Sequence, residues 1–305
     1  MNVLINSIFS PEFIFAIIRV STPLLYATIG VSLSALAGSM NIGLEGIMLV
    51  SAFGGVIISG FTGNLVLALV GGILIGVSMG ALLGYFHLKL KTDLVIAAIA
   101  LNMFASGITI LLLYIFTEDK GTSSSLTSLV FPSIQIPLIK DIPVFGEILS
   151  GHNILSYFAF ISVILFHILI YRTSLGLQIR AVGQNPDAAA SVGINVSQVK
   201  FFALLFSAFF GSLGGLYLSM GYVSWFSRDM TSGRGFIAIA AAALGGNTPI
   251  GILLGSIFFG TINTIAIYIT SLRIPSEFVS ALPYFVTVVA LTIYSIRLNK
   301  KKLWR

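Results

Sequence analysis

Apolar runs long enough to cross a membrane recur along this chain and limit its fold more than any other feature. Three of the longest occupy residues 13–37, 65–86 and 94–116. Because hydrophobic residues make up 57% of the chain and charged residues only 9%, these runs are not the core helices of a soluble domain. Lipid cannot hydrogen-bond a backbone N–H or C=O group, and the runs are too long for the strands of a barrel. The sequence therefore predicts an all-α, polytopic transmembrane helical bundle.

We expect about nine crossings, including short broken segments, in a single transmembrane domain that covers residues 1–305. The expected spans are residues 13–37, 47–60, 65–86, 94–116, 154–171, 201–220, 236–244, 250–269 and 278–296. The run at 236–244 is short. We count it as a crossing because the parity of the spans otherwise puts the C-terminal tail on the wrong side of the membrane.

Basic residues predict the orientation of these spans. Most of the 16 Lys and Arg residues lie in the tail after residue 296 and in the segments 87–93 and 172–200. By the positive-inside rule these three parts are cytoplasmic, whereas the acid-leaning loop 117–150 lies outside. The sequence thus predicts a cytoplasmic C-terminus and an external N-terminus.

One segment at membrane depth is too polar and too rich in glycine for a continuous helix in lipid. Residues 38–46 contain three glycines together with Asn41 and Glu45. Irregular backbone is tolerated in a membrane where it is buried in protein or lines a cavity, so this break is a candidate for the solute pathway. The candidate pathway residues are Asn41, Glu45, Asn102 and Asn247. Two structural alternatives remain open: the amides could form hydrogen bonds between helices, and Glu45 could fasten the break to Arg19 or to a backbone amide.

Small residues recur every four positions along two expected spans. Spacing of four places a residue on the same helical face, where small side chains let two backbones approach closely. We expect packing seams rather than ligand contacts at Gly72, Gly76, Gly80 and Gly84 and, in the second stripe, at Ser207, Gly211, Gly215 and Ser219.

A polar stretch at 172–200 interrupts the apolar sequence and predicts a short capped helix. Asn185 suits the N-cap, Pro186 the first helical position, and Asp187 the positive end of the helix dipole. Ala188 and Ala189 favour the helix, and Gly193 suits the left-handed residue that ends it. The helix could be a simple connection, or it could be a small docking element that fits a groove of another protein.

The sequence contains no pattern that indicates catalysis. His87, His152 and His167 lie in different segments, so we expect no metal site. The phosphate-binding pattern GxxxxGK[ST] is absent, so this chain is not expected to bind ATP through such a loop. Arg19 and Glu45 are the clear ionisable candidates within the spans, which favours a neutral polar solute over an ion. We therefore expect a transport subunit, not an enzyme, with no cofactor of its own.

Three patches resemble the permease subunits of binding-protein-dependent ABC importers. They are residues 41–46 with the sequence Asn-Ile-Gly-Leu-Glu-Gly, residues 176–193 around Asn185 and Pro186, and residues 235–249. The branch that this chain resembles includes branched-chain amino acid, ribose-type sugar and nucleoside systems. The resemblance implies a multi-pass protein of a prokaryotic inner membrane.

The resemblance also implies a role for the polar stretch. ABC importer permeases commonly carry Glu-Ala-Ala, three residues and then Gly, and this chain has Asp187-Ala188-Ala189 followed by Gly193. Asp replaces Glu, and the Ile-x-Leu-Pro that often follows is missing. Residues 172–200 would be a cytoplasmic coupling loop that sits in a cleft of a separate ATPase, which uses ATP and Mg²⁺. The implied coupling residues are Arg180, Asn185, Pro186, Asp187, Ala188, Ala189 and Gly193.

The further partners implied are a second, larger permease, an extracytoplasmic solute-binding protein that meets the outer loops 117–150 and 222–235, and membrane lipid, without nucleic acid. Nucleosides are the first expected solute because of the patch at 41–46. Simple sugars, flavins with a ribityl chain and branched-chain amino acids are the alternatives. A secondary transporter that needs no ATPase is the alternative of a different class, and the scarcity of acidic residues at mid-membrane speaks against it.

Overall fold

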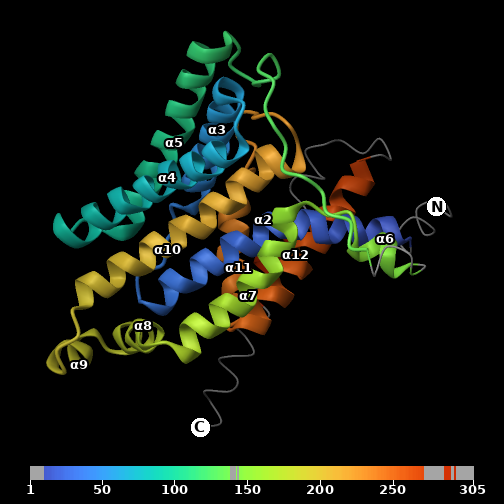
Figure 1. Ribbon diagram of the computed structural model, residues 1–305. Helices are drawn as coiled ribbons and strands as arrows, with labels where there is room; N and C mark the ends of the chain where they lie inside the picture. Colours follow the sequence, from blue (N-terminus) through green and yellow to red (C-terminus); the bar gives the residue numbers. More distant parts are fainter. Residues whose placement is uncertain (1–9, 138–141, 143, 271–284, 290–291, 293–305) are drawn as a thin grey trace.

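The computed structural model confirms an all-α bundle (Figure 1). It describes residues 10–137, 142, 144–270, 285–289 and 292. In chain order the helices are α2 (Pro11–Leu36), α3 (Leu44–Thr62), α4 (Leu65–Gly84), η1 (Tyr85–Lys89), α5 (Leu94–Thr117), α6 (Phe145–Leu149), α7 (Ile154–Arg172), α8 (Ser174–Gln184), α9 (Pro186–Ser191), α10 (Val196–Tyr217), η2 (Leu218–Tyr222), α11 (Arg234–Leu244) and α12 (Pro249–Thr270).

Seven helices in the described part of the chain are long and apolar enough to cross a membrane. Two of them combine an α-helix with a π-helical last turn, since α4 continues into η1 and α10 into η2. The run at 236–244, which was counted as a short crossing, forms the helix α11; with 11 residues it is not among these seven. The ninth expected span, 278–296, lies outside the described residues apart from 285–289 and 292.

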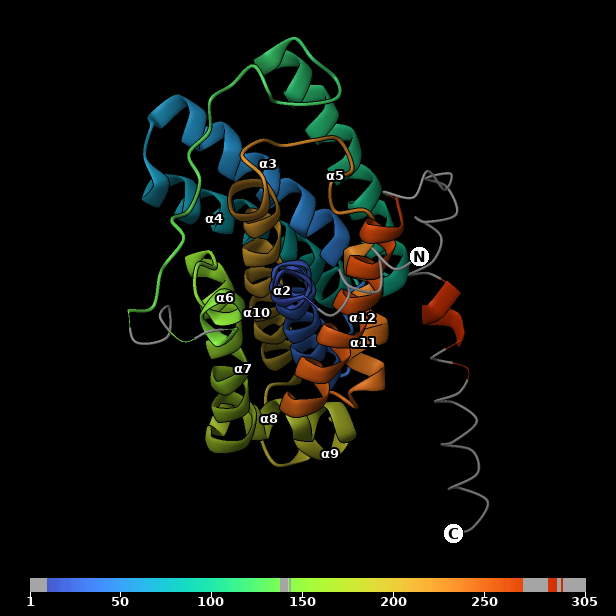
Figure 2. The same cartoon turned by 90° about the vertical axis from the view of Figure 1, so that its right-hand side faces the viewer.

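Helix α2 is the centre of the bundle. Figure 2 shows it nearly end-on, surrounded by α10, α7, α11 and α12. Most of its residues from Val20 to Ser34 are fully buried. At the periphery, α4 and α5 expose large apolar side chains such as Val66 and Met103, as is expected of helices that face lipid or another membrane protein.

The glycine stripe of α4 faces α10 along its length. A Cβ atom on Gly80 would meet the Cβ of Ala208, one on Gly72 would meet Leu216, and one on Gly84 would lie 2.7 Å from the ring of Phe201. A Cβ on Gly76 would meet the hydroxyls of Ser212 and Ser51. The absence of side chains here allows the two helices to pack closely.

The second stripe faces a different helix. A Cβ on Gly215 would meet the carbonyl oxygen of Met48 in α3, and one on Gly211 would meet the side chain of Leu44. The hydroxyl of Ser219 donates a hydrogen bond to the carbonyl of Ala52 at 2.9 Å. Helix α10 therefore presents one face to α4 and another to α3, and the two stripes do not pack against each other.

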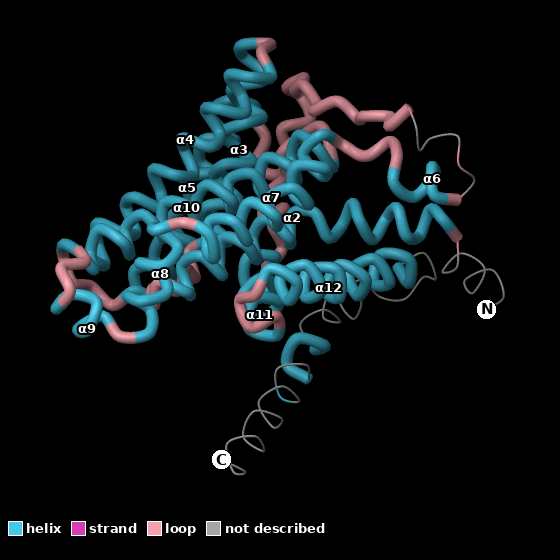
Figure 3. The backbone as a smooth tube through the Cα atoms, turned by 60° about the horizontal axis from the view of Figure 1, so that its bottom comes forward, coloured by secondary structure: helices cyan, strands magenta, loops and turns pink. Residues whose placement is uncertain are grey.

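The bundle has two different ends. In Figure 3, α8 and α9 lie at one end, whereas α6 and the long loop that follows α5 lie at the other. We call these the α8–α9 end and the loop end. Helix α8 is held close to α2, since a Cβ on Gly183 would meet the carbonyl oxygen of Leu36.

Candidate solute pathway and coupling surface

The chain folds back into the bundle after α2, and Asn41 holds this break in place. Its backbone N–H donates to the hydroxyl of Ser34 at 3.0 Å, and its side-chain oxygen accepts from the N–H of Gly43 at 3.0 Å. Its side-chain amide donates to the hydroxyl of Ser207, near the midpoint of α10, at 3.1 Å. The irregular segment thus lies within the bundle, and α3 begins there.

The carboxylate of Glu45 caps the start of α11. Its Oε1 accepts from the N–H of Gly233 and its Oε2 from the N–H of Gly235, each at 2.7 Å. The first N–H groups of a helix have no partner within the helix, and a negative charge is favourable at this end of the helix dipole. The space is tight, since a Cβ on Gly235 would lie 2.6 Å from the backbone nitrogen of Glu45. Of the two structural alternatives for Glu45, the structure shows the contact with backbone amides.

Asn102 of α5 fastens the other side of the break. Its side-chain oxygen accepts from the N–H of Gly46 at 2.8 Å, and its amide donates to the carbonyl of Ile42 at 3.1 Å. Asn41, Glu45 and Asn102 therefore meet around one irregular segment. All three side chains are engaged in hydrogen bonds within the chain.

Asn247 lies elsewhere. It occupies the turn between α11 and α12 with a left-handed φ of 54°, and its N–H donates to the carbonyl of Ala242 at 3.1 Å. Since Glu45 lies at the start of α11 and this turn at its end, the 11 residues of the helix separate the two by about 16 Å. The structure thus brings together three of the four predicted pathway residues.

Arg19 does not contact Glu45. Its guanidinium donates to the carbonyl of Tyr222 at 2.6 Å and lies over the ring of that residue, 4.3 Å from the centroid. The hydroxyl of Tyr217 donates to the carbonyl of Arg19 at 3.2 Å. Arg19 therefore joins α2 to the π-helical end of α10, toward the loop end of the bundle.

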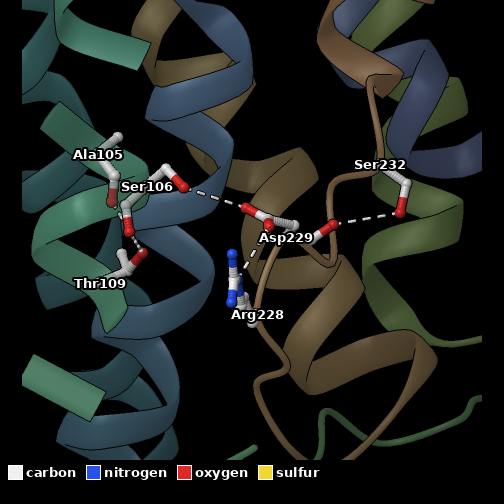
Figure 4. Close-up of polar contacts among 6 residues, drawn as sticks. All are labelled: Ala105, Ser106, Thr109, Arg228, Asp229 and Ser232. Atoms are coloured by element: carbon white, nitrogen blue, oxygen red, sulfur yellow. Dashed lines mark hydrogen bonds and ion pairs between the residues drawn. The ribbon is translucent and has the colours of Figure 1, made fainter. Parts of the chain in front are cut away.

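The segment 222–235 was expected in an outer loop, and the structure places its first half there. The N–H of Arg228 donates to the carbonyl of Gly121, in the long loop, at 2.8 Å. The N–H of Ser123, in the long loop, donates to the carbonyl of Phe226 at 2.9 Å. A few residues later the hydroxyl of Ser106, near the midpoint of α5, donates to Oδ1 of Asp229 at 3.2 Å (Figure 4). The segment therefore descends from the loop end to the middle of the bundle before α11 begins.

This segment carries two charged side chains, and the hydropathy of the sequence did not reveal their depth in the bundle. Arg228 and Asp229 form an ion pair with Nε and Oδ2 3.3 Å apart, and their side chains are 59% and 57% exposed. Asp229 has a left-handed φ of 52° and Ser232 one of 46°, conformations that non-glycine residues adopt at a cost and that cluster at functional sites. The signal in the sequence was the polar run between 224 and 234, which by itself fixes no depth.

At the α8–α9 end, the structure shows the short capped helix. The side-chain oxygen of Asn185 accepts from the N–H groups of Asp187 and Ala188 at 3.1 and 3.0 Å, and Pro186 opens α9. Gly193 follows the helix with a left-handed φ of 86°. Pro186, Asp187, Ala188 and Gly193 are exposed, whereas Ala189 is buried. The result is a small protruding knob, visible at the edge of the bundle in Figure 1.

A close contact joins α8, the helix before this knob, to the turn after α2. A Cβ on Gly38, which has a left-handed φ of 72°, would lie 3.5 Å from the Cα of Gly183 in α8. The guanidinium of Arg180 lies 5.2 Å from the centroid of the Tyr171 ring, so this predicted coupling residue packs on its own chain. Helix α8 thus connects α9 to the turn that leads into the segment 38–46.

The chain matches a known protein family. Residues 13–291 match the family described as the permease component of the branched-chain amino acid transport system. The chain belongs to this permease family.

Named relatives agree with this assignment. The permease is 32% identical to the nucleoside ABC transporter permease protein NupC of Lactococcus lactis, over 90% of this chain and 89% of the relative. It is 32% identical to the guanosine ABC transporter permease protein NupQ of Bacillus subtilis, over 92% and 91%. A second Lactococcus lactis protein, the nucleoside ABC transporter permease protein NupB, is 35% identical over 46% of this chain and 40% of the relative.

Among solved structures, the permease is similar in fold to a chain of PsaBC from Streptococcus pneumoniae in complex with Fab. The TM-score is 0.51 at 13% identity, and the match covers 90% of this chain and 89% of the other. With seven long apolar helices in its described part, the permease is a multi-pass membrane protein.

Proposed function

We propose that this permease is the membrane subunit of an ATP-driven ABC importer that carries nucleosides into the cytoplasm. The observation that carries the proposal is the 32% identity to nucleoside and guanosine permeases over nine-tenths of the chain. The polar groups around the break at 38–46 are amides, hydroxyls and one carboxylate that caps α11. These groups suit a neutral solute rich in hydrogen-bonding groups.

The knob at Pro186–Ser191 is the proposed contact with the ATPase. Three features support this: the helix is short and capped at both ends, its small side chains are exposed, and α8 connects it to the turn after α2. Closure of the ATPase on ATP would then push α9 as a rigid unit. ATP and Mg²⁺ belong to the ATPase in this proposal, and the present chain takes part in no chemical step.

The α8–α9 end is the proposed cytoplasmic side. The positively charged residues Lys89, Lys91 and Lys200 support this orientation. Residues of η1 and of the start of α10 line one pocket, and α10 begins shortly after α9. The loop end then faces outward, where an extracytoplasmic solute-binding protein would deliver the nucleoside.

A second permease is the proposed partner within the membrane. Lactococcus lactis has two nucleoside permease proteins that are similar to this chain, NupB and NupC, which supports an assembly of two different permeases. The exposed apolar face of α5, including Met103 and Leu111, is available for such a contact. The pathway would lie between the two subunits.

The test is to purify the permease from membranes of its native cell and to identify the subunits that accompany it. The proposal predicts an ABC ATPase and a second permease, and ATP hydrolysis that rises when nucleoside and binding protein are added. A cysteine introduced as Ala188→Cys should crosslink to the ATPase. A permease that purifies alone and carries out uptake alone would contradict the proposal.

A further inference from the structure

The carboxylate of Asp229 lies level with the middle of α5, whereas the backbone N–H of Arg228 donates to the carbonyl of Gly121 in the long loop at 2.8 Å. Asp229 accepts a hydrogen bond from Ser106, near the midpoint of a 24-residue helix that is long and apolar enough to cross a membrane. Both charged side chains are more than half exposed. Charged groups and irregular backbone at this depth occur where they line water or are covered by protein.

The surroundings of the ion pair indicate water rather than a dry protein contact. Ser106, Arg228 and Asp229 lie between α5 and the start of α11, beside the backbone amides that Glu45 caps (Figure 4). An ion pair that is covered by a partner needs further hydrogen bonds to offset the loss of its hydration. Here the guanidinium donates to Asp229 through Nε, and the side chain of Arg228 is 59% exposed.

We propose that Ser106, Arg228 and Asp229 form a hydrogen-bonding site for the ribose hydroxyls of the transported nucleoside on the aqueous wall of the pathway. This proposal rests on the proposed function for the identity of the solute. The vicinal diol of ribose offers two O–H donors, and a carboxylate is an established partner for such hydroxyls in proteins. The carboxylate of Asp229 accepts the diol, while the guanidinium of Arg228 donates to a ribose or base oxygen.

The carboxylate of Asp229 can accept further hydrogen bonds. In the described structure each oxygen of Asp229 already accepts one hydrogen bond, Oδ1 from Ser106 and Oδ2 from Arg228. A carboxylate oxygen has two lone pairs, so each can accept a ribose hydroxyl in addition. The two partners thus hold the carboxylate in a fixed orientation and leave it able to bind the solute.

The first test is uptake by the complete transporter in proteoliposomes, with guanosine and 2′,3′-dideoxyguanosine as the solutes. Asp229→Asn should raise the half-saturating concentration of guanosine about tenfold, because a hydrogen bond to a charged group is lost, and should leave dideoxyguanosine nearly unaffected. The matched control is Glu12→Gln, which changes an exposed carboxylate in the first turn of α2. An equal loss for both solutes, or none for either, would overturn the ribose site.

The second test measures whether the position is wet. The natural chain has no cysteine, so Ser106→Cys introduces a single thiol. A membrane-impermeant methanethiosulfonate reagent should modify it, and guanosine should slow the modification. Phe104→Cys is the control, since Phe104 lies at nearly the same depth on an apolar face of α5, beside a cavity of about 370 Å³. An unreactive Ser106→Cys, or one that guanosine does not protect, would overturn the proposal.

The two proposals fail in different ways. If the wild-type transporter moves another solute and not nucleosides, the proposed function is wrong in its substrate, and protection of Ser106→Cys by guanosine must then also be absent. If nucleoside transport is intact but Ser106→Cys is unreactive, only the ribose site is wrong.

Discussion

The carboxylate of Glu45 accepts a hydrogen bond from the backbone N–H of Gly235 at 2.7 Å, across 190 residues of sequence. The contact joins the two irregular segments of the bundle, since Glu45 begins α3 and Gly235 begins α11. Because the second carboxylate oxygen bonds Gly233, one side chain closes the end of a helix that has no side-chain cap of its own. A helix that starts inside the bundle is thereby made compatible with membrane depth.

We expect Glu45→Ala to destabilise the permease by about 1.5–3 kcal/mol, because two hydrogen bonds to a charged group are lost and two buried N–H groups are left without partners. Glu45→Gln should cost less, since its amide oxygen can still accept one of the two bonds. Thermal unfolding in detergent measures both. Glu12→Ala, which removes an exposed carboxylate from the first turn of α2, is the control. A Glu45→Ala variant that unfolds at the wild-type temperature would show that the cap is dispensable.

Asn102→Leu should cost about 1–3 kcal/mol, because the leucine side chain removes the partners of Gly46 N–H and Ile42 C=O while it occupies similar space. The comparison variant is Asn247→Gly. Glycine suits the left-handed φ of that turn, so we expect its stability to stay near the wild-type value. Equal unfolding temperatures for the two variants would contradict the structural role given to Asn102.

The packing seam between α4 and α10 predicts opposite effects for two glycines. Gly80→Ala places a methyl group against Ala208 and should destabilise the permease by about 1–3 kcal/mol. Gly107→Ala in α5 meets no atom within 4 Å and should be neutral or stabilising by up to about 1 kcal/mol, because alanine favours the helix. Thermal unfolding of the two variants compares them directly, and a stable Gly80→Ala would mean that the helices are less closely packed than described.

Ala188→Arg should abolish ATP-driven uptake and leave the unfolding temperature unchanged, since Ala188 is exposed on a knob outside the core. The arginine side chain would prevent the small helix from entering the cleft of an ATPase. Ala188→Ser keeps the residue small and should transport normally. Wild-type uptake by Ala188→Arg would remove the coupling role from α9.

The burial of His152 predicts a pH dependence of stability. Burial lowers the pKa of this imidazole, which stacks on the ring of Phe15 with the centroids 3.9 Å apart and bonds the carbonyl of Ile148 through Nε2. The unfolded chain therefore takes up the proton first, below a pH of about 6.5. The contribution of the neutral histidine to stability is present above that pH and is lost as the pH falls toward the lowered pKa, by at most about 1.4 kcal/mol per pH unit.

The measurement is thermal unfolding at pH 7.5 and 5.5. We expect His152→Gln to reduce the fall in unfolding temperature between these two values. His87→Gln, which changes a half-buried histidine in the middle of η1, should retain the wild-type fall. The same fall in His152→Gln as in the wild type would assign the pH dependence to other groups.

The features that the sequence predicted well are local ones. Asn185 and Gly193 bound a short helix through contacts with residues two to four positions away. Hydropathy over a window of about 20 residues locates the long helices. The resemblance to importer permeases came from short patches of this kind, and membership of the family is now shown.

What the sequence could not provide depends on contacts between distant segments. Glu45 reads as a costly charge in an apolar stretch, and only the position of Gly233 and Gly235 explains it. The depth of Asp229 is set by Ser106, 123 residues earlier, so a polar run after a span was assigned to an outer loop. Small residues at every fourth position predict close helix packing. They do not predict that α4 and α3 pack on different faces of α10.

The most direct test of ATP-driven nucleoside import is uptake of radiolabelled guanosine into proteoliposomes that contain the permease with its ATPase, second permease and binding protein. We predict uptake that requires ATP inside the reconstituted cytoplasmic compartment, is inhibited by unlabelled nucleosides and is unaffected by glucose or leucine. Guanosine uptake without ATP, or ATP-dependent uptake of a sugar or an amino acid but not of guanosine, would contradict it.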